Sequence, residues 1–122
     1  MGSNPINLAL RFLLELTSLI AAGMWGWHIG EGITPYLFAF TIPILLAAAW
    51  GTFNVPNDPS RSGKAPIKTP GIIRLILELS FFTFGTWCLF DLQYTNISIL
   101  FSTIVIGHYA VSYDRIKWLV LQ

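Results

Sequence analysis

Two long stretches without a charged side chain constrain most strongly how this chain can fold. Residues 32–57 and 92–113 contain no Asp, Glu, Lys or Arg, and each is longer than the roughly 20 residues that a helix needs to cross about 30 Å of hydrocarbon. Two further stretches, 6–29 and 71–90, are as apolar apart from one Arg and one Glu each. Because these four stretches occupy most of the chain, we expect an all-α integral membrane protein with four spans.

The composition also points to lipid as the main surrounding of the chain. Hydrophobic residues make up 54% and charged residues 11%, whereas soluble domains have about 45–50% and 25%. The net charge is +1 and the basic residues are scattered, which argues against nucleic acid as a partner. Cys88 is the only cysteine, so the chain forms no internal disulfide. We expect the lipid bilayer as partner and no cofactor.

The order of apolar and polar segments predicts a single transmembrane domain over residues 1–122. Its expected parts are helices over about 6–29, 35–53, 71–91 and 96–120, with a linker over 54–70. The linker contains four prolines with Ser and Gly, a mixture that disfavours helix and strand, so we expect an exposed tether. The alternative that the first span is a signal peptide is disfavoured because Glu15 interrupts its apolar region.

An internal repeat relates the two halves of the chain. The segment from Arg11 to Thr17 reads RFLLELT, and the segment from Arg74 to Ser80, 63 positions later, reads RLILELS. This similarity predicts two tandem helical hairpins, over about 6–53 and 71–120. Since each hairpin crosses the membrane twice, both would enter from the same side and form a four-helix bundle of parallel repeats.

The basic residues predict the orientation of the chain. All seven fall near the two termini or the linker if four helices cross the membrane: Arg11, Arg61, Lys64, Lys68, Arg74, Arg115 and Lys117. Lys and Arg favour cytoplasmic loops, so we expect both termini and the linker in the cytoplasm. Trp50 and Trp118 would then lie at the inner membrane interface, where indole rings are favoured.

Two Arg–Glu pairs are the first candidates for a functional site. Arg11 with Glu15, and Arg74 with Glu78, are each four residues apart, which places the side chains on one helix face. A carboxylate at membrane depth must be paired, protonated or solvated. One interpretation is a polar binding site or ion pathway near the bundle axis, with two similar halves. The other is a structural clamp between the first and third helices.

Polar residues of the fourth span are further candidates. His108 would lie near mid-membrane and serve in a proton relay or as general acid and base, or else be a neutral histidine bonded to a Ser, Thr or Tyr. His28 falls at the opposite helix end, so no metal site is expected. Asp114 and Arg115 would form an interfacial pair or contact Arg74. The sequence contains no standard catalytic or phosphate-binding motif.

Several segments together resemble the bacterial YrdB family. They are Asn7 to Leu16, Trp25-Gly26-Trp27, Ala49 to Pro56, and Pro70-Gly71 through Arg74 and Glu78. The resemblance covers most of the chain. It implies a small multi-pass protein of the bacterial inner membrane whose activity is uncharacterised, so it supports the expected fold and leaves the function open.

Three functions are compatible with these patterns. The first is a transporter or channel-like protein for a small solute or ion, with the Arg–Glu pairs and His108 along its pathway. The second is a membrane-embedded enzyme that acts on a lipid or isoprenoid, with a pocket open sideways to the bilayer. The third is a structural or accessory membrane subunit. Four short helices enclose little volume, so a homodimer is also considered.

Overall fold

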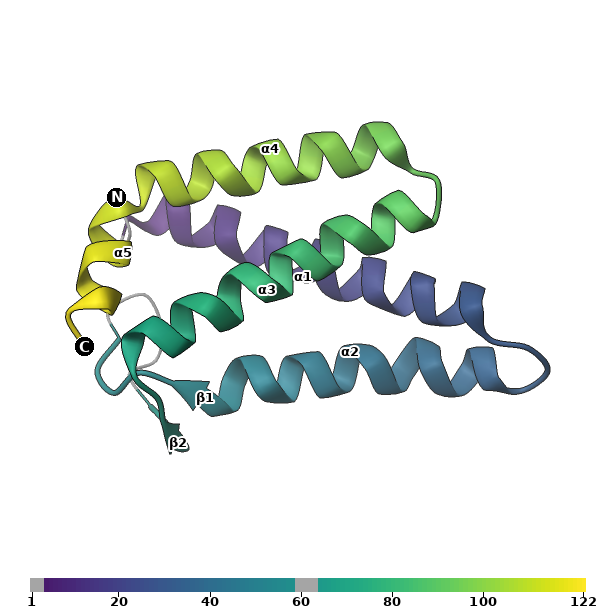
Figure 1. The fold of residues 1–122 in the computed structure, drawn as a ribbon, viewed down its shortest axis with the longest axis horizontal. Coiled ribbons are helices and arrows are strands. Elements are labelled where there is room, and N and C mark those ends of the chain that lie inside the picture. Colours follow the sequence, from purple (N-terminus) through teal and green to yellow (C-terminus); the bar gives the residue numbers. More distant parts are fainter. Residues whose placement is uncertain (1–3, 59–63) are drawn as a thin grey trace.

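The protein is described by a computed structural model that covers residues 4–58 and 64–122. Its elements, in chain order, are α1 (Pro5–Ile29), α2 (Thr34–Thr52), β1 (Phe53–Asn54), β2 (Ile67–Lys68), α3 (Gly71–Asp91), α4 (Thr95–Val111) and α5 (Tyr113–Val120). The first three long helices begin and end within one residue of the expected positions. Helix α1 begins at the end of the molecule where α5 lies, and β1 and β2 are found at that end too (Figure 1).

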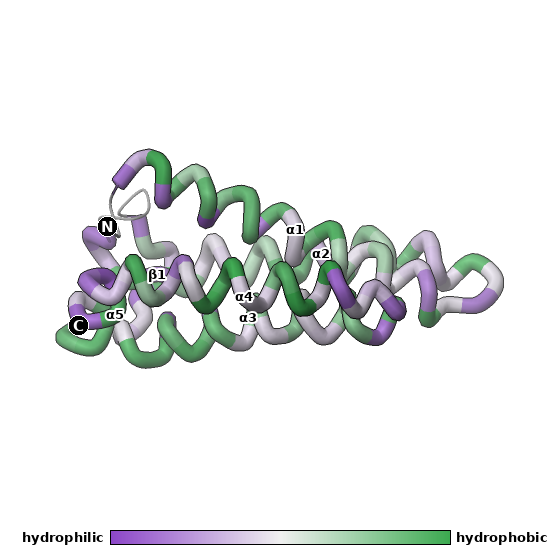
Figure 2. Tube along the Cα trace, turned by 90° about the horizontal axis from the view of Figure 1, so that it is seen from above, coloured by the Kyte–Doolittle hydropathy of each residue, from purple (hydrophilic) through white to green (hydrophobic). Residues whose placement is uncertain are grey.

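The helices have the length and composition of membrane spans. Helices α1, α2 and α3 each meet this description, and α4 with α5 counts as a fourth span only if the bent pair is taken together. Large apolar side chains point outward along the helices, with Ile6, Phe40 and Ile106 mostly exposed. Figure 2 shows these hydrophobic stretches between more hydrophilic ends. Such an apolar exterior suits lipid and is unusual for a protein in water.

The prediction of a single helix over 96–120 is wrong. The structure has two helices there, α4 and α5, separated at Ser112. Helices α4 and α5 meet there at an angle of 68°. Ser112 is fully buried, and its hydroxyl accepts a hydrogen bond of 2.6 Å from Asn7 Nδ2 of α1. The bend turns Arg115 inward, where its side chain is buried. Contacts with other elements, which hydropathy does not encode, therefore end α4.

Helices α1 and α3 pack directly against each other. Helix α2 lies mainly against α1, and α4 and α5 lie against α3. Small residues permit the close approach: a Cβ on Gly85 would lie 2.1 Å from Ser18 Oγ, and a Cβ on Gly26 would lie 2.7 Å from the Phe38 carbonyl oxygen. Ser18 also donates a 3.1 Å hydrogen bond to the Phe81 carbonyl of α3. The crossing of α1 and α3 is thus fixed by backbone proximity.

The linker is exposed in part, at Lys64, Ile67 and Lys68, but its described residues also form regular structure and buried contacts. Strands β1 and β2 form a short parallel pair with Phe53 opposite Ile67, and Thr69 N donates a 2.9 Å hydrogen bond to the Asn54 carbonyl. The two strands avoid every proline of the linker, which explains why pairing is possible. Val55 and Asp58 are buried beside them. Arg61 lies outside the described residues.

Candidate functional site

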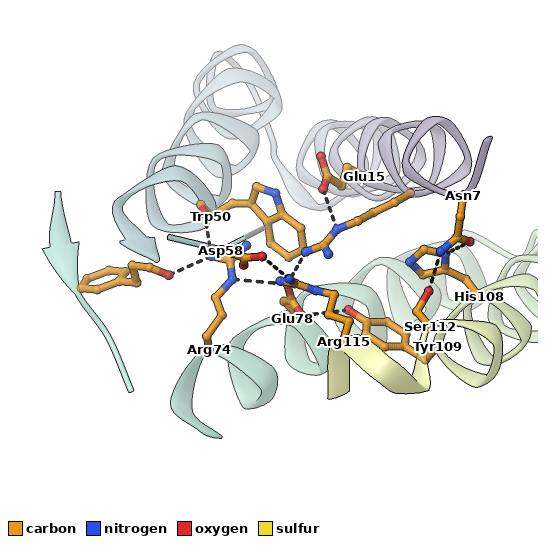
Figure 3. Close-up of polar contacts among 12 residues, drawn as sticks. Asn7, Glu15, Trp50, Asp58, Arg74, Glu78, His108, Tyr109, Ser112 and Arg115 are labelled. Carbon is orange, nitrogen blue, oxygen red and sulfur yellow. Dashed lines mark hydrogen bonds and ion pairs between the residues drawn. The ribbon is translucent and has the colours of Figure 1, made fainter. Parts of the chain in front are cut away.

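The centre of the candidate site is the carboxylate of Glu78 in α3. The side chain has no exposed surface, and the first of its partners is Arg74, one turn earlier on the same helix face, with 3.3 Å between Nε and Oε1. Arg74 is also fully buried. The expected pair is therefore present, but it is only part of a larger cluster (Figure 3).

Two more arginines reach the same carboxylate from other helices. Arg11 of α1 donates through Nη2 to Glu78 Oε1, and Arg115 of α5 donates through Nη2 to the same oxygen at 2.6 Å. Tyr109 of α4 donates its hydroxyl hydrogen to Oε2 at 3.3 Å. One buried carboxylate thus connects α1, α3, α4 and α5.

The three arginines also have partners outside Glu78. Arg11 Nε lies 3.3 Å from Glu15 Oε1, and Arg115 Nη1 lies 2.5 Å from Asp58 Oδ1. Arg74 Nη1 donates to the carbonyl oxygens of Trp50 at 2.7 Å and Phe53 at 2.8 Å. These carbonyls belong to the end of α2, where backbone acceptors lack helical partners. Arg74 therefore attaches α2 to the cluster, and Asp58 attaches the linker.

The formal charges within this cluster balance. Arg11, Arg74 and Arg115 contribute three positive charges, and Glu15, Asp58 and Glu78 contribute three negative charges. Buried ions cost several kcal/mol each unless opposite charges and hydrogen bonds compensate them. Among the described residues, this balance within a set drawn from three helices and the linker favours the burial of these groups. We call these six residues the charge cluster.

Trp50, in the last turn of α2, packs inside the protein beside the charge cluster, so its ring does not face lipid or water as a simple interfacial anchor would. Only 7% of its surface is exposed. The guanidinium carbon of Arg74 lies 4.4 Å from the ring centroid, and Phe81 packs against the ring at 4.4 Å between centroids. The face of the indole ring attracts the buried guanidinium of Arg74 and partly replaces its lost hydration.

His108 lies beside the charge cluster, in the last turn of α4 before the bend. Its Nδ1 is 3.0 Å from Oδ1 of Asn7, in the first turn of α1. The expected hydrogen-bonded histidine is therefore observed with an Asn as partner in place of a Ser, Thr or Tyr. Ser112 completes the chain by accepting from Asn7, so three buried polar side chains join the start of α1 to the end of α4.

The two Arg–Glu pairs differ more than their shared sequence predicts. Both have 3.3 Å between Nε and Oε1, which follows from the helical spacing. Glu15, however, has 18% of its side chain exposed and pairs with Arg11, whereas Glu78 is enclosed by three arginines and has no exposed surface. The two sites thus differ in burial, and α5 brings Arg115 to Glu78.

Sequence reasoning missed the roles of Asp58, Asn7 and Arg115. Asp58 is the one acidic residue between Glu31 and Glu78, and this isolation among basic residues was a usable signal for an internal partner. Arg115 contacts Asp58 and Glu78, so the contact expected with Arg74 or Asp114 is replaced by these two. Asn7 carried no signal beyond being polar at the start of an apolar helix.

The described chain offers little for a metal or a bound substrate at the charge cluster. Residues 4–58 and 64–122 contain no group of three His, Cys, Asp or Glu side chains able to hold a metal ion. Surface hollows of about 310 and 240 Å³ lie between α3 and α4 and between α2 and α3. Their linings are mainly apolar and include neither Glu15, Glu78 nor His108.

Comparison with known proteins gives the chain a family. Residues 9–106 match the family described as "Protein of unknown function (DUF2568)". The chain is also similar to "Uncharacterized protein YrdB" of Bacillus subtilis (strain 168), with 40% identity over 119 residues, which cover 98% of this chain and 97% of the relative. No solved structure matches the chain.

Proposed function

We propose that this chain, which belongs to the YrdB family of unknown function, is a structural or accessory membrane subunit whose charge cluster locks one end of the helices together. The observation that carries the proposal is the saturation of Glu78. Its oxygens receive three guanidinium groups and a tyrosine hydroxyl while the side chain has no exposed surface. A carboxylate held in this way is suited to fixing helices, and because it has no exposed surface it does not face a passing solute.

The lock reaches every major element of the chain. Arg11 and Arg115 bring α1 and α5 to Glu78 of α3, and Arg74 holds the carbonyls at the end of α2. Such networks cost desolvation energy, and their benefit is a unique arrangement more than stability as such. A unique helix arrangement would serve a membrane subunit that must present a fixed surface to lipid or to a partner.

Transport is the second candidate. It is favoured by the charged side chains that lie within the apolar helices. Ionisable residues inside spans commonly mark a solute or proton pathway. A pathway through Arg11, Glu15, Arg74, Glu78 and His108 requires the cluster to open, because packed side chains close it in this structure.

A lipid or isoprenoid enzyme requires an acid or base in a lateral hollow, and the hollows described above have apolar and hydroxyl linings. The lock therefore accounts for more of the geometry.

The location proposed for the lock is the cytoplasmic side of a bacterial inner membrane. Support comes from the seven basic residues of the sequence, which the four-span arrangement gathers at one end. We retain the parallel hairpin repeat and the four-helix bundle as part of this proposal, supported by the similarity of the segments that begin at Arg11 and Arg74. A homodimer stays a prediction.

The proposal is tested by comparing folded protein with cellular function. The gene is deleted in the host, and Glu78→Gln or Glu15→Gln variants are supplied at matched expression. For each strain, the amount of detergent-stable protein in the membrane and the rescue of the deletion phenotype are measured. A structural lock predicts that rescue follows the amount of folded protein, and that higher expression of Glu78→Gln restores it.

A transport role predicts a different pattern in the same experiment. Glu78→Gln would then fail to rescue even when folded protein reaches the amount present with the unchanged chain. Glu15→Gln is the matched control, because it makes the same chemical change at a partly exposed carboxylate in the equivalent sequence position. Loss of rescue with folded Glu78→Gln protein would overturn the structural proposal.

A further inference from the structure

The Asn7 side chain determines which nitrogen of His108 carries the hydrogen. Asn7 Nδ2 donates to Ser112 Oγ at 2.6 Å, so the amide oxygen is the atom that lies 3.0 Å from His108 Nδ1. An amide oxygen only accepts hydrogen bonds, so Nδ1 must be the donor. In a neutral imidazole the other nitrogen, Nε2, is then an acceptor with a free lone pair.

His108 Nε2, Arg11 Nη1 and Arg115 Nε are buried polar atoms of this region that have no hydrogen-bond partner among the described residues. The three residues are only 3%, 3% and 4% exposed, in the same order. Buried polar atoms are nearly always hydrogen-bonded, so these three atoms are suited to binding a further polar group.

The three residues surround one side of Glu78. Arg11 and Arg115 both donate to Glu78 Oε1, which places their guanidinium groups side by side. The His108 ring lies 5.3 Å from the ring of Tyr109, whose hydroxyl reaches the other oxygen of Glu78. Figure 3 shows His108 on the side of the charge cluster next to Tyr109 and Arg115.

We propose that His108 Nε2, Arg11 Nη1 and Arg115 Nε form a binding site for one hydroxyl group. A hydroxyl oxygen accepts hydrogen bonds from the two arginine donors, and its hydrogen is donated to His108 Nε2. An anion does not fit this set, because the lone pair of Nε2 repels it and the cluster is already balanced in charge. The hydroxyl belongs either to water or to the headgroup of a lipid such as phosphatidylglycerol.

Nuclear magnetic resonance of the unchanged protein in vesicles tests the site directly. The protein is labelled with 15N-histidine and reconstituted in phosphatidylcholine, whose headgroup has no hydroxyl, or in phosphatidylglycerol. At pH 7 we expect His108 to be the Nδ1–H tautomer, with magnetisation transfer from a hydroxyl hydrogen to Nε2. His28, at the opposite end of α1, is the internal control.

The vesicle composition identifies the source of the hydroxyl. Transfer in both kinds of vesicle supports the site with water as its ligand, and transfer in phosphatidylglycerol alone supports it with a lipid headgroup. Removing the amide with Asn7→Ala should convert a single tautomer into a mixture. The proposal is overturned by an Nε2–H tautomer or a doubly protonated His108 in the unchanged protein, or by the absence of hydroxyl transfer in both kinds of vesicle.

Discussion

Replacing Glu78 by Gln should destabilise the protein far more than the same change at Glu15. The substitution preserves side-chain volume, so it leaves no cavity, but Arg11, Arg74 and Arg115 lose the carboxylate that they share. Removing one partner of a buried ion pair typically costs about 3–5 kcal/mol. Glu15 is partly exposed, and its ion pair with Arg11 is 3.3 Å long; about 0–1 kcal/mol is expected for such a pair.

Cys88 supplies a built-in reporter for this comparison. It is the only cysteine of the chain and is fully buried in α3, so a thiol-reactive fluorescent dye labels it only when the helices separate. In detergent, the labelling midpoint should fall by roughly 10–20 °C for Glu78→Gln and by a few degrees at most for Glu15→Gln, using several degrees per kcal/mol for a chain of this size. Equal midpoints for the two variants would refute the reasoning.

Two further predictions use the same labelling assay. Asp58→Asn should lower the midpoint by roughly 5–10 °C, because Arg115 loses one of its two buried carboxylates. A hydrogen bond to a charged group contributes about 1.5–3 kcal/mol. An unchanged midpoint would show that the linker is not part of the lock. Gly71→Ala should also lower the midpoint strongly, since a Cβ there would lie 1.6 Å from the Leu119 carbonyl oxygen. Gly107→Ala should leave the midpoint unchanged or raise it, because a Cβ at that position has nothing within 4 Å. Equal effects of the two glycine changes would contradict the packing of α5 on α3.

The sequence predicts the long helices well because their signal is local. A run of apolar residues long enough to cross a membrane leaves few alternatives to a helix, and the bounds of α1, α2 and α3 follow from where polar residues interrupt the runs. The spacing of Arg74 and Glu78 likewise predicts their contact, since both side chains lie on one face of one helix. Inferences that depend on a single element are therefore the ones that hold.

The errors concern contacts between distant elements. The bend at Ser112 depends on Asn7, and the burial of Asp58 depends on Arg115, 57 positions away. Hydropathy assigns Trp50 to the interface because indole rings are common there, but it carries no information about the arginine that packs over the ring. The repeat has the same limitation, because the similarity of the two segments does not reveal that Arg115 contacts Glu78.

The most direct test of the account is an experimental structure of the protein in lipid nanodiscs, at a resolution that shows ordered water around Glu78. The account predicts that the guanidinium groups of Arg11, Arg74 and Arg115 contact the Glu78 carboxylate, with packed side chains separating it from bulk solvent. A hydrated or ligand-filled cavity that joins Glu78 and Glu15 to the surface would contradict the structural lock and favour a transport pathway.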